Sequence, residues 1–432
     1  MLLRRLPSST LGRVILWAGM IMLTLFTLAA LTGIARPSLA LPGVHGKENA
    51  IHHNTSSSSL LAELALGKVL SDASPVFGNY IDLQTHTSEW MKAYPDTTLL
   101  AHMNLPGTHD AATWNYSLAT QRSLDHVTNL VNDVEFDPAA YRCQTRSLNR
   151  MLDDGIRVFD LRYAYDVTNS SLVFWHSMAL QSETATVDDV MYGFYHWLDQ
   201  HPSEVVLLSF QYQGSTAPYA TNSEGVQRLL FETLKSPAAK RYIQQETGTL
   251  GTLGESRGKI VLLKRFDLDK LPDTYGAAFP GLHFSPTNWT DNGDDITLVL
   301  NETTGLTAYI EDYYQPQTPF SSTAQENIRW KVNATEAHLR KAATMHPDSL
   351  FWTFASSTNL LNKHPITPEI QALGNGSLTP EGGVNEQLVP FLREMQGHRL
   401  GIVMFDFYET PHELLPLFLS LLPPSRIGSY SS

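Results

Sequence analysis

Four short apolar runs in this chain each end in titratable side chains, and they constrain the fold more than any other feature. The runs cover residues 105–110, 158–162, 172–176 and 401–406. A strand buried on both faces reads as a near-continuous apolar run, as parallel strands between layers of helices do. In a barrel of such strands, the polar residues at the strand ends meet at one rim. The pattern therefore predicts an α/β enzyme whose chemistry lies at the rim of a barrel.

Strand and helix patterns alternate along residues 97–425. The clearest helix is expected at 187–200, because Thr186 can cap it and its apolar residues share one face. Further helices are expected at 223–235, 323–345, 383–396 and 411–422. The last of them opens with Thr410 as a cap and Pro411 at the first helical position. Strands are expected at 204–212, 259–266, 350–356 and 400–406. Residues 267–321 lack a clear period, so we expect rim loops with one short strand near 306–312. This order predicts a single-domain, irregular TIM-type (β/α) barrel.

The N-terminal part of the chain has the pattern of an export signal. Three arginines precede an apolar run at 14–34, and small residues precede Ala40. This order is typical of a signal peptide, although the run is also long enough to span a bilayer as a signal anchor. We therefore expect residues 1–40 to be a signal peptide or signal anchor and 41–96 to be an exposed linker and N-terminal extension. Within that extension, residues 61–96 show no clear period.

Asn-x-Ser/Thr sequons also indicate export, because such sites are glycosylated in secreted proteins. They begin at Asn54, Asn115, Asn169, Asn288, Asn301, Asn333 and Asn375. We expect a secreted or extracellular protein, and retention by an N-terminal membrane anchor stays open. Cys143 is the only cysteine, so the sequence excludes an internal disulfide and predicts no cysteine-based metal site.

The charge of the chain limits its partners. The formal net charge is −13 at pH 7, and four of the arginines lie in the first 40 residues, which carry no acid. A body this acidic repels the phosphate backbone of a nucleic acid, so we expect no nucleic-acid partner. We expect a monomer.

The residues at the strand ends are of the types that act on a phosphodiester. Cleavage needs one group to take a proton from the attacking hydroxyl and another to give a proton to the departing oxygen. Histidine suits both tasks, because its ordinary pKa lies near operating pH. Arginine can bind two phosphate oxygens and stays charged. His109, His176 and Arg162 supply these parts, and Asp110 and Asp406 can orient the imidazoles.

Five segments, in order, resemble the X-domain of phosphatidylinositol-specific phospholipase C, in particular the small bacterial-type enzymes and their secreted fungal relatives. They are Leu105-Pro-Gly-Thr-His-Asp110, Gly155-Ile-Arg-Val-Phe-Asp-Leu-Arg162, Trp175-His176, Ser203-Glu-Val-Val-Leu-Leu-Ser209 and Gly258-Lys-Ile-Val-Leu-Leu-Lys-Arg265. The resemblance implies cleavage of a phosphatidylinositol-like phosphodiester to a cyclic phosphate and diacylglycerol. It also implies a phospholipid or glycosylphosphatidylinositol-type substrate at a membrane surface.

The resemblance implies a role for each catalytic candidate. His109 matches the general base of the family, and Asp406 matches the carboxylate that orients it. His176 matches the general acid, and Asp110 matches the aspartate beside that acid. Arg162 matches the arginine that binds the phosphate.

Four further residues fall where the bacterial enzymes contact the inositol ring. Arg265, Asp312 and Tyr314 match contacts of the head group. Gln211 stands where the family has a lysine, so the chain departs from the family at this point. The departure bears on the choice of head group and leaves phosphodiester chemistry intact.

Arg162 bears on the use of a metal ion. It follows Asp160 by two residues, so both side chains project from the same face of a strand. In the calcium-dependent animal members of the family, the corresponding pair is acidic and binds the ion. Because a guanidinium can supply the positive charge here, we predict no metal ion and no other cofactor. Asp160 can equally be a structural support for Arg162.

Other interpretations of these residues stay open. The segment 254–258 fits the Gly-x-Ser-x-Gly pattern of serine esterases, but it precedes a predicted strand, whereas that chemistry needs a strand before the serine. His109 and Asp110 can be a capped turn, and Arg265 can simply pair with Asp267. The whole chain can also be an exported barrel that binds a lipid or glycan without turning it over.

Overall fold

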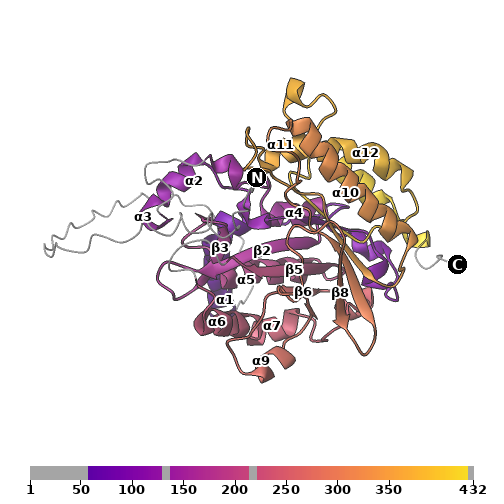
Figure 1. The fold of residues 1–432 in the computed structure, drawn as a ribbon. Coiled ribbons are helices and arrows are strands. Elements are labelled where there is room, and N and C mark those ends of the chain that lie inside the picture. The colour runs from indigo at the N-terminus through magenta and orange to yellow at the C-terminus, as the bar shows by residue number, and fades with distance from the viewer. Residues whose placement is uncertain (1–56, 129–136, 214–220, 427–432) are drawn as a thin grey trace, which may run out of the picture. The chain divides into compact units, whose positions relative to one another are not determined.

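The computed structural model describes residues 57–128, 137–213 and 221–426, which build a sheet with helices on its outer face (Figure 1). Eight strands run parallel in the order β7-β6-β5-β2-β1-β11-β10-β9. Their bounds are β1 Leu105–Thr108, β2 Val158–Tyr165, β5 Val205–Tyr212, β6 Lys259–Arg265, β7 Leu282–His283, β9 Leu306–Glu311, β10 Leu350–Phe354 and β11 Ile402–Phe405. The sheet curves into a nearly closed barrel, so the predicted TIM-type fold is confirmed.

Three antiparallel strands lie outside this parallel series. β8 (Ile296–Asn301) pairs with β9, and the hairpin of β3 (Leu172–His176) and β4 (Ala179–Leu180) pairs with the end of β2. The sequence placed residues 172–176 among the strands that end at the barrel rim. The structure corrects this, because β2 extends beyond the barrel and β3 folds back along that extension.

Side chains along each barrel strand point alternately into the barrel and toward the helices. In β2, Val158 joins an apolar cluster inside the barrel, whereas Phe159 packs in the cluster between sheet and helices. Asp160 and Arg162 follow Val158 in steps of two, so they also point inward. The interior is thus apolar at the amino ends of the strands and polar at their carboxyl ends.

Helix α5 (Val187–Gln200) has the bounds that the sequence predicts. The Thr186 hydroxyl accepts a hydrogen bond from the amide of Asp189, and the Asp189 carboxylate accepts one from the amide of Thr186, which completes a capping box. The buried face of α5 packs on α1 (Ser57–Phe77), where Phe194 meets Phe77 edge-on with ring centroids 5.3 Å apart. The N-terminal extension therefore contributes a helix that covers the barrel, although its sequence shows no clear period.

The helices expected at 223–235, 323–345 and 383–396 are present within two residues of those bounds, and the structure adds short helices that were not predicted. The α-helices are α2 Leu118–Ser123, α3 Asp125–Thr128, α4 Leu148–Asp154, α6 Glu224–Leu234, α7 Pro237–Tyr242, α8 Leu253–Ser256, α9 Asp273–Ala277, α10 Ala324–Thr344, α11 Pro368–Leu373, α12 Val384–Glu394 and α13 Leu414–Ser420. Short 3-10 turns are η2 Trp90–Ala93, η3 Leu100–His102, η4 Ala111–Thr113, η5 Pro138–Ala140, η6 Gly376–Leu378 and η7 Pro424–Arg426.

Two regions differ from the prediction. Residues 267–321 contain α9, β7 and β8 in addition to the predicted strand, which is β9. β7 has only two residues, and in β8 the exposed Val299 breaks the alternation of apolar and polar residues that marks a half-buried strand, so the sequence period does not reveal them. Helix α13 begins at Leu414 rather than at Pro411, and no side chain caps it.

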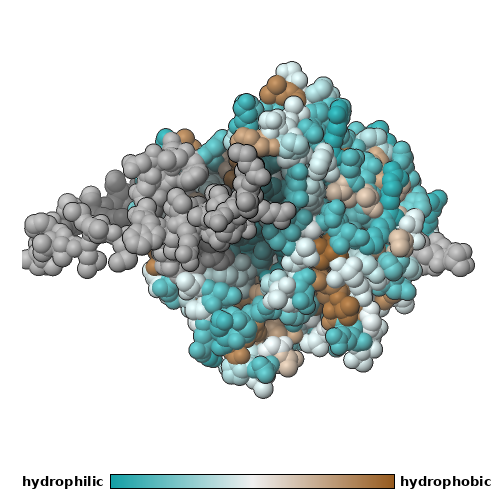
Figure 2. Space-filling view, in the orientation of Figure 1, coloured by the Kyte–Doolittle hydropathy of each residue, from teal (hydrophilic) through white to brown (hydrophobic). Residues whose placement is uncertain are grey.

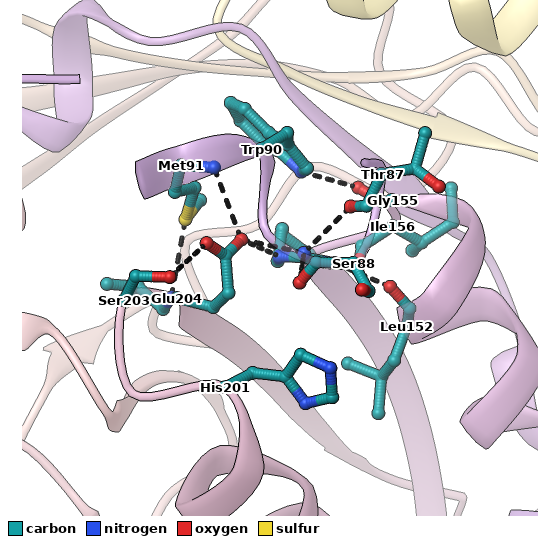
Figure 3. A network of polar contacts seen from close by, with 12 residues as sticks. Thr87, Ser88, Trp90, Met91, Leu152, Gly155, Ile156, His201, Ser203 and Glu204 are labelled. Atoms are coloured by element: carbon teal, nitrogen blue, oxygen red, sulfur yellow. Dashed lines mark hydrogen bonds and ion pairs between the residues drawn. The ribbon is translucent and has the colours of Figure 1, made fainter. Parts of the chain in front are cut away.

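A buried ion pair fixes the amino ends of β2 and β5, at the opposite end of the strands from the polar interior (Figure 3). Two nitrogens of Arg157 lie 2.7 and 3.0 Å from Oε2 of Glu204, and both side chains are fully buried. Arg157 also donates to the carbonyl oxygens of Leu152, Ile156, Thr87 and Ser88. The pair therefore joins the segment before η2 to α4 and to two barrel strands.

The face in Figure 2 is largely hydrophilic, with an apolar patch over the β8–β9 hairpin, where Val299 is exposed. Within the part of the chain that the structure describes, no helix has both the length and the hydrophobicity to cross a membrane. The predicted signal segment at 1–40 and the sequon at Asn54 lie outside the described residues. The division of the chain at residues 40 and 96 stays a prediction.

Candidate active site

All nine candidate residues come together at the carboxyl ends of the barrel strands. Seven line one cavity of about 1160 Å³, namely His109, Arg162, His176, Gln211, Arg265, Asp312 and Tyr314. Asp110 and Asp406 are buried against the two histidines. The residues come from β2, β5 and β6, from the positions just after β1, β9 and β11, and from the hairpin strand β3. Inward alternation along parallel strands is what brings these separate segments to one place.

His109 lies between a carboxylate and a guanidinium. Its Nδ1 is 3.0 Å from Oδ1 of Asp406, and its Nε2 is 2.8 Å from a terminal nitrogen of Arg162. A guanidinium can only donate hydrogen bonds, so Nε2 of His109 accepts and Nδ1 donates its proton to Asp406. The carboxylate thus fixes the tautomer that leaves Nε2 as the basic atom.

His176 is fixed in a similar way by a backbone group. Its Nδ1 lies 2.7 Å from the carbonyl oxygen of Tyr141, and its Nε2 lies 3.2 Å from Oδ2 of Asp110. Because a carbonyl only accepts, Nδ1 carries a proton, and Nε2 is the atom that can take up or release a second proton. The centroids of the His109 and His176 rings are 6.3 Å apart, so two proton-transfer groups face one small space.

Arg162 is held in place by two acids. Its Nε lies 3.0 Å from Oδ1 of Asp110 and 3.3 Å from Oδ2 of Asp160, which also accepts the backbone amide of Asp110 at 3.3 Å. Burial lowers the pKa of Arg162, but the charges of Asp110 and Asp160 outweigh it and raise the pKa above the ordinary value. Arg162 is therefore a permanent cation. The contacts of Asp160 show that this carboxylate holds the Arg162 side chain in position.

Burial also shifts the pKa values of His109 and of the two carboxylates beside the histidines. The pKa of His109 is lowered well below the ordinary value by burial and by the nearby charge of Arg162. Burial raises the pKa of Asp406 well above its usual range, and burial raises the pKa of Asp110 although Arg162 and His176 oppose it. A lowered pKa keeps the His109 imidazole unprotonated at neutral pH, as a general base requires.

A second cluster forms the opposite wall of the cavity. The guanidinium of Arg265 lies 3.8 Å from the centroid of the Trp289 ring and 3.2 Å from Oδ2 of Asp312, which also accepts the indole N–H at 2.8 Å. The Tyr314 hydroxyl donates to Asp291 at 2.9 Å. Asp267 contacts His283 instead of Arg265, so the alternative of a simple pair between residues 265 and 267 is wrong.

Gln211 lies between the two arginines. Strand pairing sets it beside Arg162 of β2 on one side and beside Arg265 of β6 on the other. Its Oε1 is buried and makes no hydrogen bond within the described structure. An amide at this point offers both a donor and an acceptor, whereas a lysine offers donors only.

No family model matches the sequence. The chain is 25% identical over 280 residues to the 1-phosphatidylinositol phosphodiesterase of Staphylococcus aureus (strain Newman), covering 63% of this chain and 76% of that protein. It is 31% identical over 134 residues to PI-PLC X domain-containing protein 1 of Danio rerio, covering 28% and 42%. The solved F249X mutant of the S. aureus phosphatidylinositol-specific phospholipase C superposes with a TM-score of 0.58 at 17% identity, over 78% of this chain and 98% of that one.

The similarities in sequence and fold together support the PI-PLC X-domain family for this chain. Two amides that the sequence analysis missed shape the base of the site. Gln144 donates to the carbonyl oxygens of His109 and Phe405, which joins the ends of β1 and β11. Asn385 of α12 donates to the carbonyl oxygens of Asp406, Phe407 and Thr410. Isolated amides carry no spacing signal, so sequence alone could not select them.

Glycine is required at one position of the motif. A Cβ added at Gly107 would lie 2.4 Å from the sulfur of Met404 and 2.9 Å from Cβ of Val158. Any larger residue would push β1 away from β11 and β2, because β1 pairs with both strands. Gly107 therefore keeps His109 at its distance from Arg162 and Asp406.

The serine-esterase alternative fails on geometry. Ser256 ends the short helix α8, is fully buried, and precedes β6. A nucleophile elbow places the serine after a strand and before a helix, which is the reverse order. Ser256 therefore lies near the amino end of β6, whereas Arg265, which lines the cavity, lies at the carboxyl end of that strand.

Three groups of side chains in the described residues have ligand atoms close enough to share a cation. They are His109, Asp110 and Asp160; His109, Cys143 and Asp406; and Asp110, Cys143 and His176. Arg162 lies 3.0–3.3 Å from two carboxylates of the first group, so its guanidinium takes the place that a hard cation would need there. That the reaction needs no metal stays a prediction.

Proposed function

We propose that this PI-PLC X-domain cleaves a phosphatidylinositol-like phosphodiester by general acid–base catalysis. The observation that carries the proposal is the pair of imidazoles, 6.3 Å apart, with the Arg162 guanidinium against one of them. The curated relatives named 1-phosphatidylinositol phosphodiesterase support the same reaction class, which makes the chain a phosphoric diester hydrolase. The family fold and the cavity support it further.

In the proposed reaction, Nε2 of His109 takes the proton of the attacking hydroxyl. Arg162 occupies that lone pair in the structure, so the guanidinium must turn to the phosphate as the substrate binds. Nε2 of His176, beside Asp110, then gives a proton to the departing lipid oxygen. Arg162 stabilises the charge on the phosphate, and the fixed Nδ1–H of each ring prevents the wrong tautomer.

If the attacking hydroxyl belongs to the head group itself, the first products are a cyclic phosphate and diacylglycerol. Attack within one bound molecule can lower the barrier by about 7–11 kcal/mol through positioning alone. The wall formed by Arg265, Asp312 and Trp289 suits a polyol ring, because it combines charged hydrogen-bonding groups with an apolar face. The proposed substrate is a phospholipid or a glycosylphosphatidylinositol-type lipid at a membrane surface. We propose that the protein binds it as a monomer.

The test is release of diacylglycerol from phosphatidylinositol vesicles, with phosphorus NMR to identify the cyclic phosphate. His109→Ala and His176→Ala should each lower kcat by about 10²–10⁴-fold, since each removes one proton-transfer group. His126→Ala is the matched control, because His126 is exposed and lies outside the cavity lining. Full turnover by either active-site variant would refute the assignment.

A binding protein without turnover is the second candidate. Assays of product release, run in chelator and with lipids of several head groups, distinguish the enzyme from the binding protein, because a binding protein retains lipid without releasing product. Activity that disappears in chelator and returns with a divalent ion would contradict the metal-free mechanism. We also propose that the protein acts outside the cell, on the basis of the sequons and the N-terminal pattern.

A further inference from the structure

The one cysteine of the chain lies at the centre of the candidate active site. Cys143 is fully buried, and its backbone is held at both ends. Its amide donates to the Thr113 hydroxyl at 2.9 Å, and its carbonyl oxygen accepts from the amide of Phe407 at 3.1 Å. These contacts fix the thiol between the turn that follows β1 and the chain that follows β11.

Two groups of potential metal ligands share this thiol. Cys143, His109 and Asp406 form one group, and Cys143, Asp110 and His176 form the other; in each, the ligand atoms lie within 4.8 Å of one another. Each group offers one sulfur, one imidazole nitrogen and one carboxylate oxygen. Zinc bonds to such atoms at about 2.0–2.3 Å in a tetrahedron, so its ligands lie about 3.3–3.8 Å from one another. Side-chain movements of about 1 Å would complete the group with His176, whose Nε2 carries a lone pair because Nδ1 donates to the Tyr141 carbonyl. In the other group, Nδ1 of His109 donates to Asp406 and Nε2 accepts from Arg162, so this imidazole has no lone pair for an ion.

The charges around the thiol favour a cation. Three carboxylates, those of Asp110, Asp160 and Asp406, are almost completely buried here. Arg162 contacts Asp110 and Asp160, and Arg265 contacts Asp160. Oδ2 of Asp110 makes no hydrogen bond in the described structure, although the side chain is only 2% exposed, and it lies 3.2 Å from Nε2 of His176. A buried carboxylate oxygen without a donor is costly, and a cation bound beside Nε2 would satisfy it.

We propose that Cys143, His176 and Asp110 bind a soft divalent cation of the zinc class, and that the bound ion inhibits the enzyme. His109 and His176 line the cavity, so an ion from solvent reaches the thiol past their rings. The thiol releases its proton to solvent and bonds to the ion as a thiolate, and one imidazole lends its lone pair. The blocked imidazole no longer transfers protons, so the inhibitory part rests on the proposed function.

The proposed site departs from the expectation that a chain with a single cysteine has no cysteine-based metal site. That expectation considered the spacing of several cysteines along the sequence. The structure instead surrounds one thiol with histidines and aspartates from separate strands. Sulfur ligands select zinc-class ions, whereas Mg²⁺ and Ca²⁺ prefer oxygen ligands, so those two ions should have no effect through this site.

The binding test uses the full chain and Cd²⁺, which gives an ultraviolet charge-transfer band when it bonds to a thiolate. The wild-type protein should show the band, Zn²⁺ should displace it, and Cys143→Ser should lack it. Loss of a ligand should weaken binding by more than about 100-fold, since loss of an outer partner alone costs about 10–100-fold. Absence of the band in the wild type would overturn the proposal, whatever substrate the enzyme accepts.

The activity test measures phosphatidylinositol cleavage with increasing Zn²⁺, each variant relative to its own rate in chelator. Zn²⁺ should inhibit the wild type reversibly, and Cys143→Ser should resist it. Equal inhibition of both proteins would assign the effect to other groups and refute the proposal. If Cys143→Ser does not fold, Cys143→Ala is the second variant. The absorption spectrum of Co²⁺ bound to the wild-type protein reports a bond to thiolate without any variant.

Discussion

Lys331 of α10 holds the backbone on both sides of Asp312. Its ammonium group, fully buried, lies 2.6 Å from Oε1 of Glu311 and 3.0 Å from the carbonyl oxygen of Tyr313. The amide of Tyr313 donates to the same carboxylate oxygen at 2.9 Å. Burial raises the pKa of Glu311 to about 7, although Lys331 opposes the shift. Neither side chain lines the cavity, so the pair acts on the head-group wall through the chain and through the charge of Lys331, which opposes the rise that burial causes in the pKa of Asp312.

Replacing Lys331 should therefore affect stability and substrate binding together. Lys331→Met leaves Glu311 buried without its cation, which should cost about 3–5 kcal/mol of unfolding free energy. KM for the lipid should rise more than kcat falls, because Asp312 belongs to the proposed head-group wall. The double variant with Glu311→Gln should regain part of the stability in urea unfolding. If single and double variants unfold at the same urea concentration, the pair is not coupled.

Single residues of the site were predictable where strand periodicity applies. Asp160, Arg162 and Asp406 follow apolar strand residues in steps of two, and the structure points all three inward. Trp289, which stacks on Arg265, lies in a stretch without a period, so no pattern could select it. Cys143 was noted only as unpaired, because its neighbours come together through the barrel topology alone.

At the scale of elements, the Arg157–Glu204 pair joins the amino ends of β2 and β5 (Figure 3). Arg157→Met leaves the buried Glu204 carboxylate without its cation and removes one donor from several carbonyl oxygens, so it should lower the unfolding free energy by about 3–5 kcal/mol. Arg329→Met is the matched control, since the Arg329–Glu381 pair is about half exposed and should contribute far less to stability. Equal losses in chemical denaturation would contradict the assigned role of the buried pair.

Elements with their own signals were predicted closely. α5 has a capping box and an apolar face, and its observed bounds match the prediction. α13 was placed too early, because a threonine–proline pair suggested a cap that the structure does not use. α1 buries only its last turns, against α4 and α5, so its position depends on tertiary contacts rather than on a period.

At the scale of the whole molecule, the order of parallel strands explains why the fold was predictable and the head-group wall was not. Near-continuous apolar runs mark β2, β5, β6, β10 and β11 as strands covered on both faces, and parallel strands of this kind predict the barrel and its polar rim. The wall is built from the 267–321 region, where β8 and β9 pair locally and Trp289 precedes them. Local pairing of short strands follows from packing rather than from sequence period.

Export is a property of the whole molecule that the sequons allow to be tested. Asn115, Asn169, Asn288, Asn333 and Asn375 are exposed, so an oligosaccharide transferase could reach each of them, whereas Asn301 is half-buried. We expect the protein collected from the medium of its own host to carry N-glycans, and glycosidase treatment to convert the modified asparagines to aspartates in mass spectra. Ser377→Ala removes the sequon at Asn375 and should remove one glycan without affecting activity. An unglycosylated protein found only inside the cell would contradict the proposed location.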